Sequence, residues 1–470
     1  MTETIIPAKK LSVFKLFQQA VRGDITDFTT GSINKAIFLL AVPMILEMVL
    51  ESLFAIVDIY FVNQVGTAAV STVILTEASL TILYSVAWGL AMGVTAMVAR
   101  RAGEKNFAAA GDIAAQAILL ATFFSIIISI TGFIFPKEIL GFMGASKDVV
   151  KENFLFTQIM LTGNIVIMLL FVNNGIFRGI GNANLAMKSL LIANAINIIL
   201  DPLLIKGIGP FPELGLHGAA VATTIGRACG VVYQLYFLFN GKALVKLVKK
   251  QFTISITIMK QILDTSLGGM FQFIIGSCSW IFLAKLIAGF GTAVTAGYGT
   301  AIRICIFTIL PAWGLANAAA TLVGQNLGAG QPERAEKSVW RTAFMALCFF
   351  ALVALIFFFF GATLMRFFTA DKVAIESGTL CLHILAIGYI FFAYGMIITQ
   401  SFNGAGDTKT PTYINLFVFW LIQIPIAYLF VKYLKFGQEG VYMAICIAES
   451  ILAAVSIIIF KRGKWKSIKV

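Results

Sequence analysis

Three carboxylates stand within the first long apolar stretch of the chain, residues 34–62. They are Glu47, Glu51 and Asp58, and apolar residues surround each of them. On a helix, Glu51 lies about 40° and Asp58 about 20° from Glu47, so one face carries all three over about 16 Å of axis. If the stretch crosses a membrane, each charge near its centre costs at least about 2.5–3.5 kcal/mol, so this face is expected to look into protein or water. Asp58 is therefore a candidate functional carboxylate; the alternative is a purely structural carboxylate that neighbouring helices satisfy.

A second polar face lies in the stretch NAINIILDP. Asn194, Asn197 and Asp201 stand at positions i, i+3 and i+7, which share one side of a helix. Pro202 lacks the N–H that a helix needs, and it frees a backbone carbonyl one turn earlier. Because polar faces avoid lipid, the face with Asp58 and the face with Asp201 are expected to meet inside a helical bundle.

The next apolar stretch adds a hydroxyl, from Thr223 or Thr224. Carboxylates, amides and hydroxyls are hard oxygen ligands, which suit a proton or a small hard cation such as Na⁺ and do not suit zinc or copper. If Asp58 and Asp201 approach each other, the repulsion between their negative charges favours protonation of at least one of them. The pair would then hold a proton or exchange it for a cation. No metal cofactor is expected.

The composition shows which elements must position these groups. The 470 residues are 59% hydrophobic and 12% charged, whereas a soluble domain is about 45–50% apolar and about 25% charged. We expect an all-α integral membrane protein, because long apolar spans must satisfy their backbone internally. Twelve spans are predicted at 34–62, 68–99, 108–135, 154–177, 186–207, 215–239, 258–289, 293–324, 338–368, 376–401, 410–434 and 438–460.

The two halves of the chain are copies. AWGLA at 87–91 returns at 312–316, GTA at 66–68 returns at 291–293, and Gly103 returns as Gly328, always at the same sequence offset. Each copy holds six spans, so both insert with the same orientation. We predict two six-helix lobes related by a pseudo-two-fold axis along the membrane normal, an architecture typical of transporters. Channels and scaffolds built from duplicated bundles are the alternatives.

The formal net charge of +13 is distributed as in a membrane protein rather than a nucleic-acid-binding protein. Basic residues gather at both ends of the chain, in the loop 240–257 and at every second inter-helix loop, which places both termini and this loop in the cytoplasm. Six cysteines form no CxxC or CxxH pattern, so neither a disulfide framework nor a zinc site is indicated. The predicted organisation is a cytoplasmic segment with an amphipathic helix (1–33), an N-lobe (34–239), a linker (240–257), a C-lobe (258–460) and a basic tail (461–470).

The second half does not repeat the acids. At the offset that relates the two copies, Leu283 corresponds to Asp58 and Ile426 corresponds to Asp201. The isolated charges of the second half are Lys285, Arg303 and Glu449, and His383 lies in the tenth span. His383 is expected to be a hydrogen-bonded structural residue, and Lys285 either reaches the membrane surface or pairs with an acid. The asymmetry predicts ion binding in the first lobe alone.

Several ordered motifs resemble one transporter family. GQNLGAGQPERAEK (324–337), VDIYFVNQVGTAAVS after the first span, FRGIGN (177–182) and FNGAGDTKTPT (402–412) are similar to the multidrug and toxic compound extrusion (MATE) transporters. The resemblance covers nearly the whole chain. It implies a monomeric plasma-membrane antiporter that exports amphipathic, often cationic drugs in exchange for H⁺ or Na⁺, through a cleft between the lobes.

The resemblance also implies a set of site residues. Asp58, Asn197, Asp201 and Thr223 match the family's cation ligands, and Asn174 is a weaker match in the same pocket. The NorM-type branch carries an acid on the seventh helix, where this chain has Gly276, so the pattern is closer to the DinF-like branch.

Glu47 and Glu51 are acids that the family motif does not require. We expect them either in a wet vestibule or at the cytoplasmic entrance, where they attract cationic substrates. A flippase for lipid-linked glycans is the alternative function. It would be expected to have a basic cleft for the pyrophosphate, and Lys285 and Arg303 are too few to indicate one strongly. A membrane enzyme is disfavoured, because HExxH, GxSxG and clustered His and Asp residues are missing from the sequence.

Overall fold

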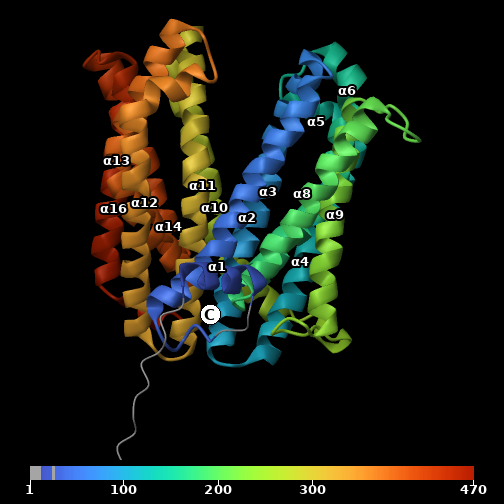
Figure 1. Ribbon diagram of the computed structural model, residues 1–470, viewed down its shortest axis with the longest axis vertical. Helices are drawn as coiled ribbons and strands as arrows, with labels where there is room; N and C mark the ends of the chain where they lie inside the picture. Colours follow the sequence, from blue (N-terminus) through green and yellow to red (C-terminus); the bar gives the residue numbers. More distant parts are fainter. Residues whose placement is uncertain (1–11, 24–26) are drawn as a thin grey trace, which may run out of the picture.

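The computed structural model describes residues 12–23 and 27–470, and this part of the chain is built from helices without strands. The helices form two bundles, one from each half of the chain (Figure 1). The basic residues Lys9 and Lys10 of the predicted N-terminal segment lie outside the described residues.

The N-lobe follows the six predicted spans closely. Its fourth span is two helices that meet at Gly163, and a short helix precedes them. The bounds are α2 Ile33–Asn63, α3 Thr67–Gly103, α4 Phe107–Ile134, α5 Pro136–Phe142, α6 Lys147–Thr162, α7 Asn164–Gly179, α8 Ala183–Lys206 and α9 Leu216–Asn240.

The C-lobe repeats this order. Its eleventh span is continuous but alternates α and π turns around Pro425, which cannot donate an ordinary helical hydrogen bond. The bounds are α10 Ile256–Ala288, α11 Thr292–Gly328, α12 Pro332–Arg366, α13 Lys372–Ala405, α14 Lys409–Asn415, η2 Leu416–Gln423, α15 Ile424–Tyr428, η3 Leu429–Tyr433 and α16 Gly437–Lys461.

Within the described residues, eleven of these helical spans are long and apolar enough to cross a membrane. The twelfth is α9, whose 25 residues include Arg227 and several small residues. The predicted fold class, an all-helical membrane protein with twelve spans in two lobes, is confirmed.

The contacts between the lobes show the pseudo-two-fold axis. Gly89 packs against Met270 of the other lobe, and Gly314 packs against Ile45; the two glycines are equivalent in the sequence repeat, and so are their two partners. The rings of Trp88 and Trp313, another equivalent pair, meet with centroids separated by 6.2 Å. Residues at equivalent positions of α3 and α11 therefore face each other across the axis.

The same symmetry holds toward the ends of α3 and α11. Gly103 abuts the backbone of Gln325, and Gly328 abuts the backbone of Arg100. The Gln325 side chain donates to the carbonyl of Gly179 at 2.8 Å, while the Arg100 guanidinium donates to the carbonyl of Ala405 at 3.4 Å. This half of the lobe–lobe interface is closely packed, backbone against backbone.

The lobes converge at the end of the molecule that holds the C-terminus and diverge toward the opposite end (Figure 1). Two terminal segments hold the lobes together at the converged end: residues 27–31, called here the N-terminal strap, and the C-terminal residues that follow α16. Arg334 of α12 donates to the carbonyls of Gly31 and Thr30, each at 2.8 Å, and Arg100 donates to the carbonyl of Ile468 at 2.7 Å. The N-terminal strap is also fixed to the N-lobe by Lys105 and Asp27, 2.6 Å apart, and this hydrogen bond from Lys105 lowers the pKa of Asp27 to about 2.

Two predicted peripheral segments lie around this end. The amphipathic segment forms α1 (Val13–Arg22), in which Val13 and Phe14 are exposed; its position on a membrane surface stays a prediction. The linker 240–257 is tied to α4, because the Gln116 side chain donates to the carbonyls of Gln251 and Thr253.

Adding one methyl group should test the close backbone contact. We expect Gly103→Ala to destabilise the protein by about 1–3 kcal/mol, because the new Cβ would meet the backbone of Gln325, which cannot rotate away. The readout is the thermal unfolding midpoint of the purified protein. Gly276→Ala is the matched control, since a Cβ there meets nothing within 4 Å, and an equal drop in both variants would contradict the packing argument.

Candidate cation site in the N-lobe

The three helices predicted to carry ion ligands do meet. Asp58 of α2 accepts a hydrogen bond at Oδ1 from the Thr223 hydroxyl of α9, at 3.3 Å. The amide of Asn197 on α8 donates to Thr223 Oγ1 at 3.4 Å and to Asp201 Oδ1 at 3.1 Å. One chain of hydrogen bonds thus links Asp58, Thr223, Asn197 and Asp201. The neighbouring Thr224 donates to its own helix, at the carbonyl of Ala220, so Thr223 is the hydroxyl that faces the cluster.

This cluster is buried and has unused acceptors. Asp201 and Asn197 are 0% exposed, and Asp58 is partly exposed. Asp201 Oδ2 and Asn197 Oδ1 have no hydrogen-bond partner. In the described part of the chain, no Lys or Arg forms an ion pair with either aspartate. The group therefore has free oxygen atoms that can bind a proton or ligate Na⁺. It also has a negative charge that either ion would neutralise.

Glu47 belongs to a separate buried cluster. It is 1% exposed, accepts a hydrogen bond from the Asn174 amide at 2.9 Å and lies 3.8 Å from Nη1 of Arg178 on α7. Gln234 of α9 in turn donates to Asn174 Oδ1 at 2.6 Å. Asn174 is thus bonded to Glu47 and Gln234 and not to the Asp58 group, and Glu47 does not lie in an open vestibule.

Glu51 also has an internal counter-ion. Its Oε1 lies 3.6 Å from Nη2 of Arg227 on α9, one helical turn from Thr223, and its side chain is 27% exposed. The Arg227 guanidinium lies over the Phe54 ring, 4.9 Å from the centroid. Two of the three acids on the polar face of α2 are therefore matched by buried arginines, and Asp58 is the unmatched one.

The sequence reasoning missed Arg178 and Arg227. The cost of burying a charge in a membrane, which singled out the acids, applies equally to these two bases and was the available signal. It also missed Glu77, an exposed acid in the first third of α3. In the second lobe, His383 packs beside the Phe358 ring, with centroids 5.4 Å apart.

Comparison with known proteins identifies the family. The profile of the MatE family matches residues 43–203 and 269–429, once in each lobe and over more than half of the chain. The chain belongs to the MatE family. Members of this family are transporters rather than enzymes.

Relatives of this MatE protein span nearly its full length. It is 26% identical over 434 residues to the probable multidrug resistance protein NorM of Thermotoga maritima, covering 92% of this chain and 93% of the relative. It is 24% identical to an FAD transporter of Shewanella oneidensis, covering 90% and 93%. It is 23% identical to the multidrug export protein MepA of Staphylococcus aureus, covering 92% and 94%.

Solved structures of MatE-type proteins have the same fold. A structure described as an outward-facing conformation of a multidrug resistance MATE family transporter superposes with a TM-score of 0.87 at 26% identity, covering 94% of this chain and 99% of that one. A Pyrococcus furiosus transporter of the MOP superfamily, described as having a binding pocket of reversed polarity, superposes with a TM-score of 0.87 at 25% identity, covering 95% and 100%.

Proposed function

We propose that the protein is a secondary active multidrug exporter that exchanges H⁺ or Na⁺ for amphipathic, often cationic organic compounds. The observation that carries this proposal is the pair Asp58 and Asp201, linked through Thr223 and Asn197 and left without a counter-ion. Two carboxylates in one hydrogen-bonded chain, with Asp201 fully buried and Asp58 partly exposed, favour the binding of positive charge, and this charge is the proposed coupling ion.

The exchange follows from differential affinity in two states. With the site open to the outside, H⁺ or Na⁺ binds at Asp58 and Asp201, changes the packing of α2 against α8 and α9, and weakens drug binding. When the lobes rock, the ion leaves on the other side and the anionic pair favours the next cationic drug. A ligand shifts the lobes only by as much as its affinity for the two states differs.

The proposed orientation places both termini in the cytoplasm, as the basic tail and linker suggest. The end at which the lobes diverge then faces outward (Figure 1). The likeness to an outward-facing relative supports this assignment. The protein would act as a monomer in the plasma membrane. In a cell that has two membranes, this is the inner membrane.

The other acids of α2 have different proposed roles. Glu51 is partly exposed and stays the candidate acid for attracting cationic drugs. Glu47, Asn174 and Arg178 form a buried polar cluster between the proposed ion site and the converged end. We place the protein nearer the DinF-like branch, since the acid set lies in the first lobe and Gly276 stands where the NorM-type branch has an acid.

Everted membrane vesicles test the function and the ion together. We expect uptake of a cationic fluorescent drug to stop when the coupling gradient is collapsed, by a protonophore for H⁺ or by equal Na⁺ on both sides for Na⁺. Collapse of the other gradient should leave uptake unchanged, because one pair of carboxylates serves one coupling ion. Uptake that is insensitive to both would contradict the proposal, and transfer of a lipid-linked glycan between leaflets would favour a flippase.

A further inference from the structure

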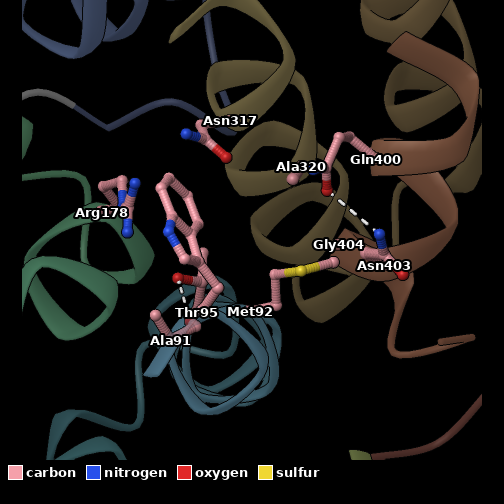
Figure 2. Close-up of a pocket in the computed structure, with 10 residues that line it drawn as sticks. Ala91, Met92, Thr95, Arg178, Asn317, Ala320, Gln400, Asn403 and Gly404 are labelled. Atoms are coloured by element: carbon pink, nitrogen blue, oxygen red, sulfur yellow. Dashed lines mark hydrogen bonds between the residues drawn. The ribbon is translucent and has the colours of Figure 1, made fainter. Parts of the chain in front are cut away.

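A pocket lies in the lobe–lobe interface on the side of the converged end, next to the Trp88 ring. Figure 2 shows its walls, which come from both lobes: α3 and α7 on one side and α11 and α13 on the other. Arg178 and Asn317 point into it from opposite lobes. Arg178 and Asn403, both in the wall, are equivalent positions of the sequence repeat, so the pocket lies at the pseudo-two-fold axis.

The pocket presents unsatisfied hydrogen-bond donors. Arg178 is 4% exposed and Asn317 is 9% exposed. Arg178 Nη1 and Asn317 Nδ2 have no hydrogen-bond partner, since Glu47 lies 3.8 Å from Nη1, beyond hydrogen-bonding distance. A buried donor without a partner costs about 1–3 kcal/mol, and more when it is charged. A ligand that accepts from both donors would remove this cost.

The remaining wall carries no negative charge of its own. The residues around the pocket include no Asp or Glu, and Glu47, which forms the ion pair with Arg178 at 3.8 Å, stands outside the wall. The Gln400 side-chain oxygen accepts from the Asn403 amide at 3.1 Å, and the Thr95 hydroxyl donates to the Ala91 carbonyl at 2.7 Å. Neither oxygen is hydrogen-bonded to Arg178 Nη1 or Asn317 Nδ2. Hydrogen bonds from a guanidinium to an anion are about twice as strong as neutral ones.

We propose that this pocket binds a small monovalent anion, a halide ion or a carboxylate, between Arg178 of the N-lobe and Asn317 of the C-lobe. One ligand then comes from each lobe, so the anion bridges them on the side of the converged end. Moving the lobes apart at this end separates the two donors and releases the anion. The anion therefore stabilises the arrangement seen here, and its concentration shifts the balance between the two states of the transporter.

The test is binding to the purified full-length protein, independent of transport. The protein is placed in chloride-free gluconate buffer, and chloride or formate is added at constant ionic strength. We expect a saturable rise in the thermal midpoint of at least about 2 °C for chloride, formate or both. Iodide should also quench the Trp88 emission saturably, and this component should be missing in Trp88→Phe.

Variants separate the site from a general salt effect. Arg178→Gln and, should that variant fail to fold, Asn317→Ala should lose the anion-dependent rise. Arg303→Gln is the matched control, because Arg303 is an exposed arginine on the same helix as Asn317, and it should keep the rise. Equal midpoints in gluconate, chloride and formate would overturn the proposal and leave water as the occupant. A rise that persists in both pocket variants would overturn it as well.

Discussion

Replacing Asp58 or Asp201 by Asn is expected to abolish ion-coupled drug efflux, lowering the initial rate of ion-driven drug uptake by about two orders of magnitude. A loss of this size corresponds to the upper end of ordinary coupling free energies. The substitution removes the charge and little else. Thr223 still has an oxygen to donate to at position 58, and Asn197 still has one at position 201. The measurement is drug uptake into proteoliposomes driven by an imposed H⁺ or Na⁺ gradient.

The stability of these variants distinguishes a functional acid from a structural one. An uncompensated buried carboxylate destabilises a fold, so the thermal midpoint should stay the same or rise when it becomes an amide. Glu449→Gln is the control, because Glu449 is an intramembrane acid of the other lobe and should keep coupled transport. Normal efflux in Asp58→Asn, or a clear fall in its midpoint, would show that the carboxylate serves the structure instead.

The fold could be predicted from the sequence largely because the membrane leaves few choices. Apolar length fixes a helix, and the internal repeat fixes a second copy of the bundle. The break at Gly163 and the π turns around Pro425 could not be predicted, because both depend on local hydrogen bonding that apolar length does not encode. The structure adds the interface between the lobes, where Gly89 and Gly314 make equivalent contacts.

The candidate site was predictable where residues share a helix face and less so where they depend on a partner helix. Spacing alone put Asn197 and Asp201 on one face, and the structure brings them to Asp58. Spacing said nothing about which base would approach which acid. The arginines decide this, because Arg178 and Arg227 compensate Glu47 and Glu51 and leave Asp58 unmatched.

The two lobes share one backbone arrangement but carry different residues at equivalent positions. The residue equivalent to Asp58 is Leu283, which is buried in the apolar core of the C-lobe. Polar substitutions in the first copy thus leave the backbone symmetry intact, as the paired glycine contacts show. We infer that rocking of the two lobes is a symmetric motion that an asymmetric ion site drives.

A cysteine pair at the open end should lock that motion. Ile74 of α3 and Gly299 of α11 are equivalent positions of the repeat, and each precedes its tryptophan of the Trp88–Trp313 pair by the same interval. That interval is about four helical turns, which returns to within about 40° of the same helix face, about 21 Å farther along the axis. Both positions should therefore line the space between the lobes. Ile74 is 52% exposed, and a Cβ on Gly299 meets nothing within 4 Å, so the two sites are apart in this structure.

When the lobes close at this end, equivalent positions should meet there as they do at the converged end. In a background without the native cysteines, we expect Ile74→Cys with Gly299→Cys to form a disulfide under oxidation during turnover, because their Cα atoms come within about 7 Å. The cross-link should stop drug uptake, and a reductant should restore it, whereas each single-cysteine variant should transport normally in both conditions. If the pair stays reduced during active transport, or if the cross-linked protein still transports, the lobes do not alternate by closing along α3 and α11.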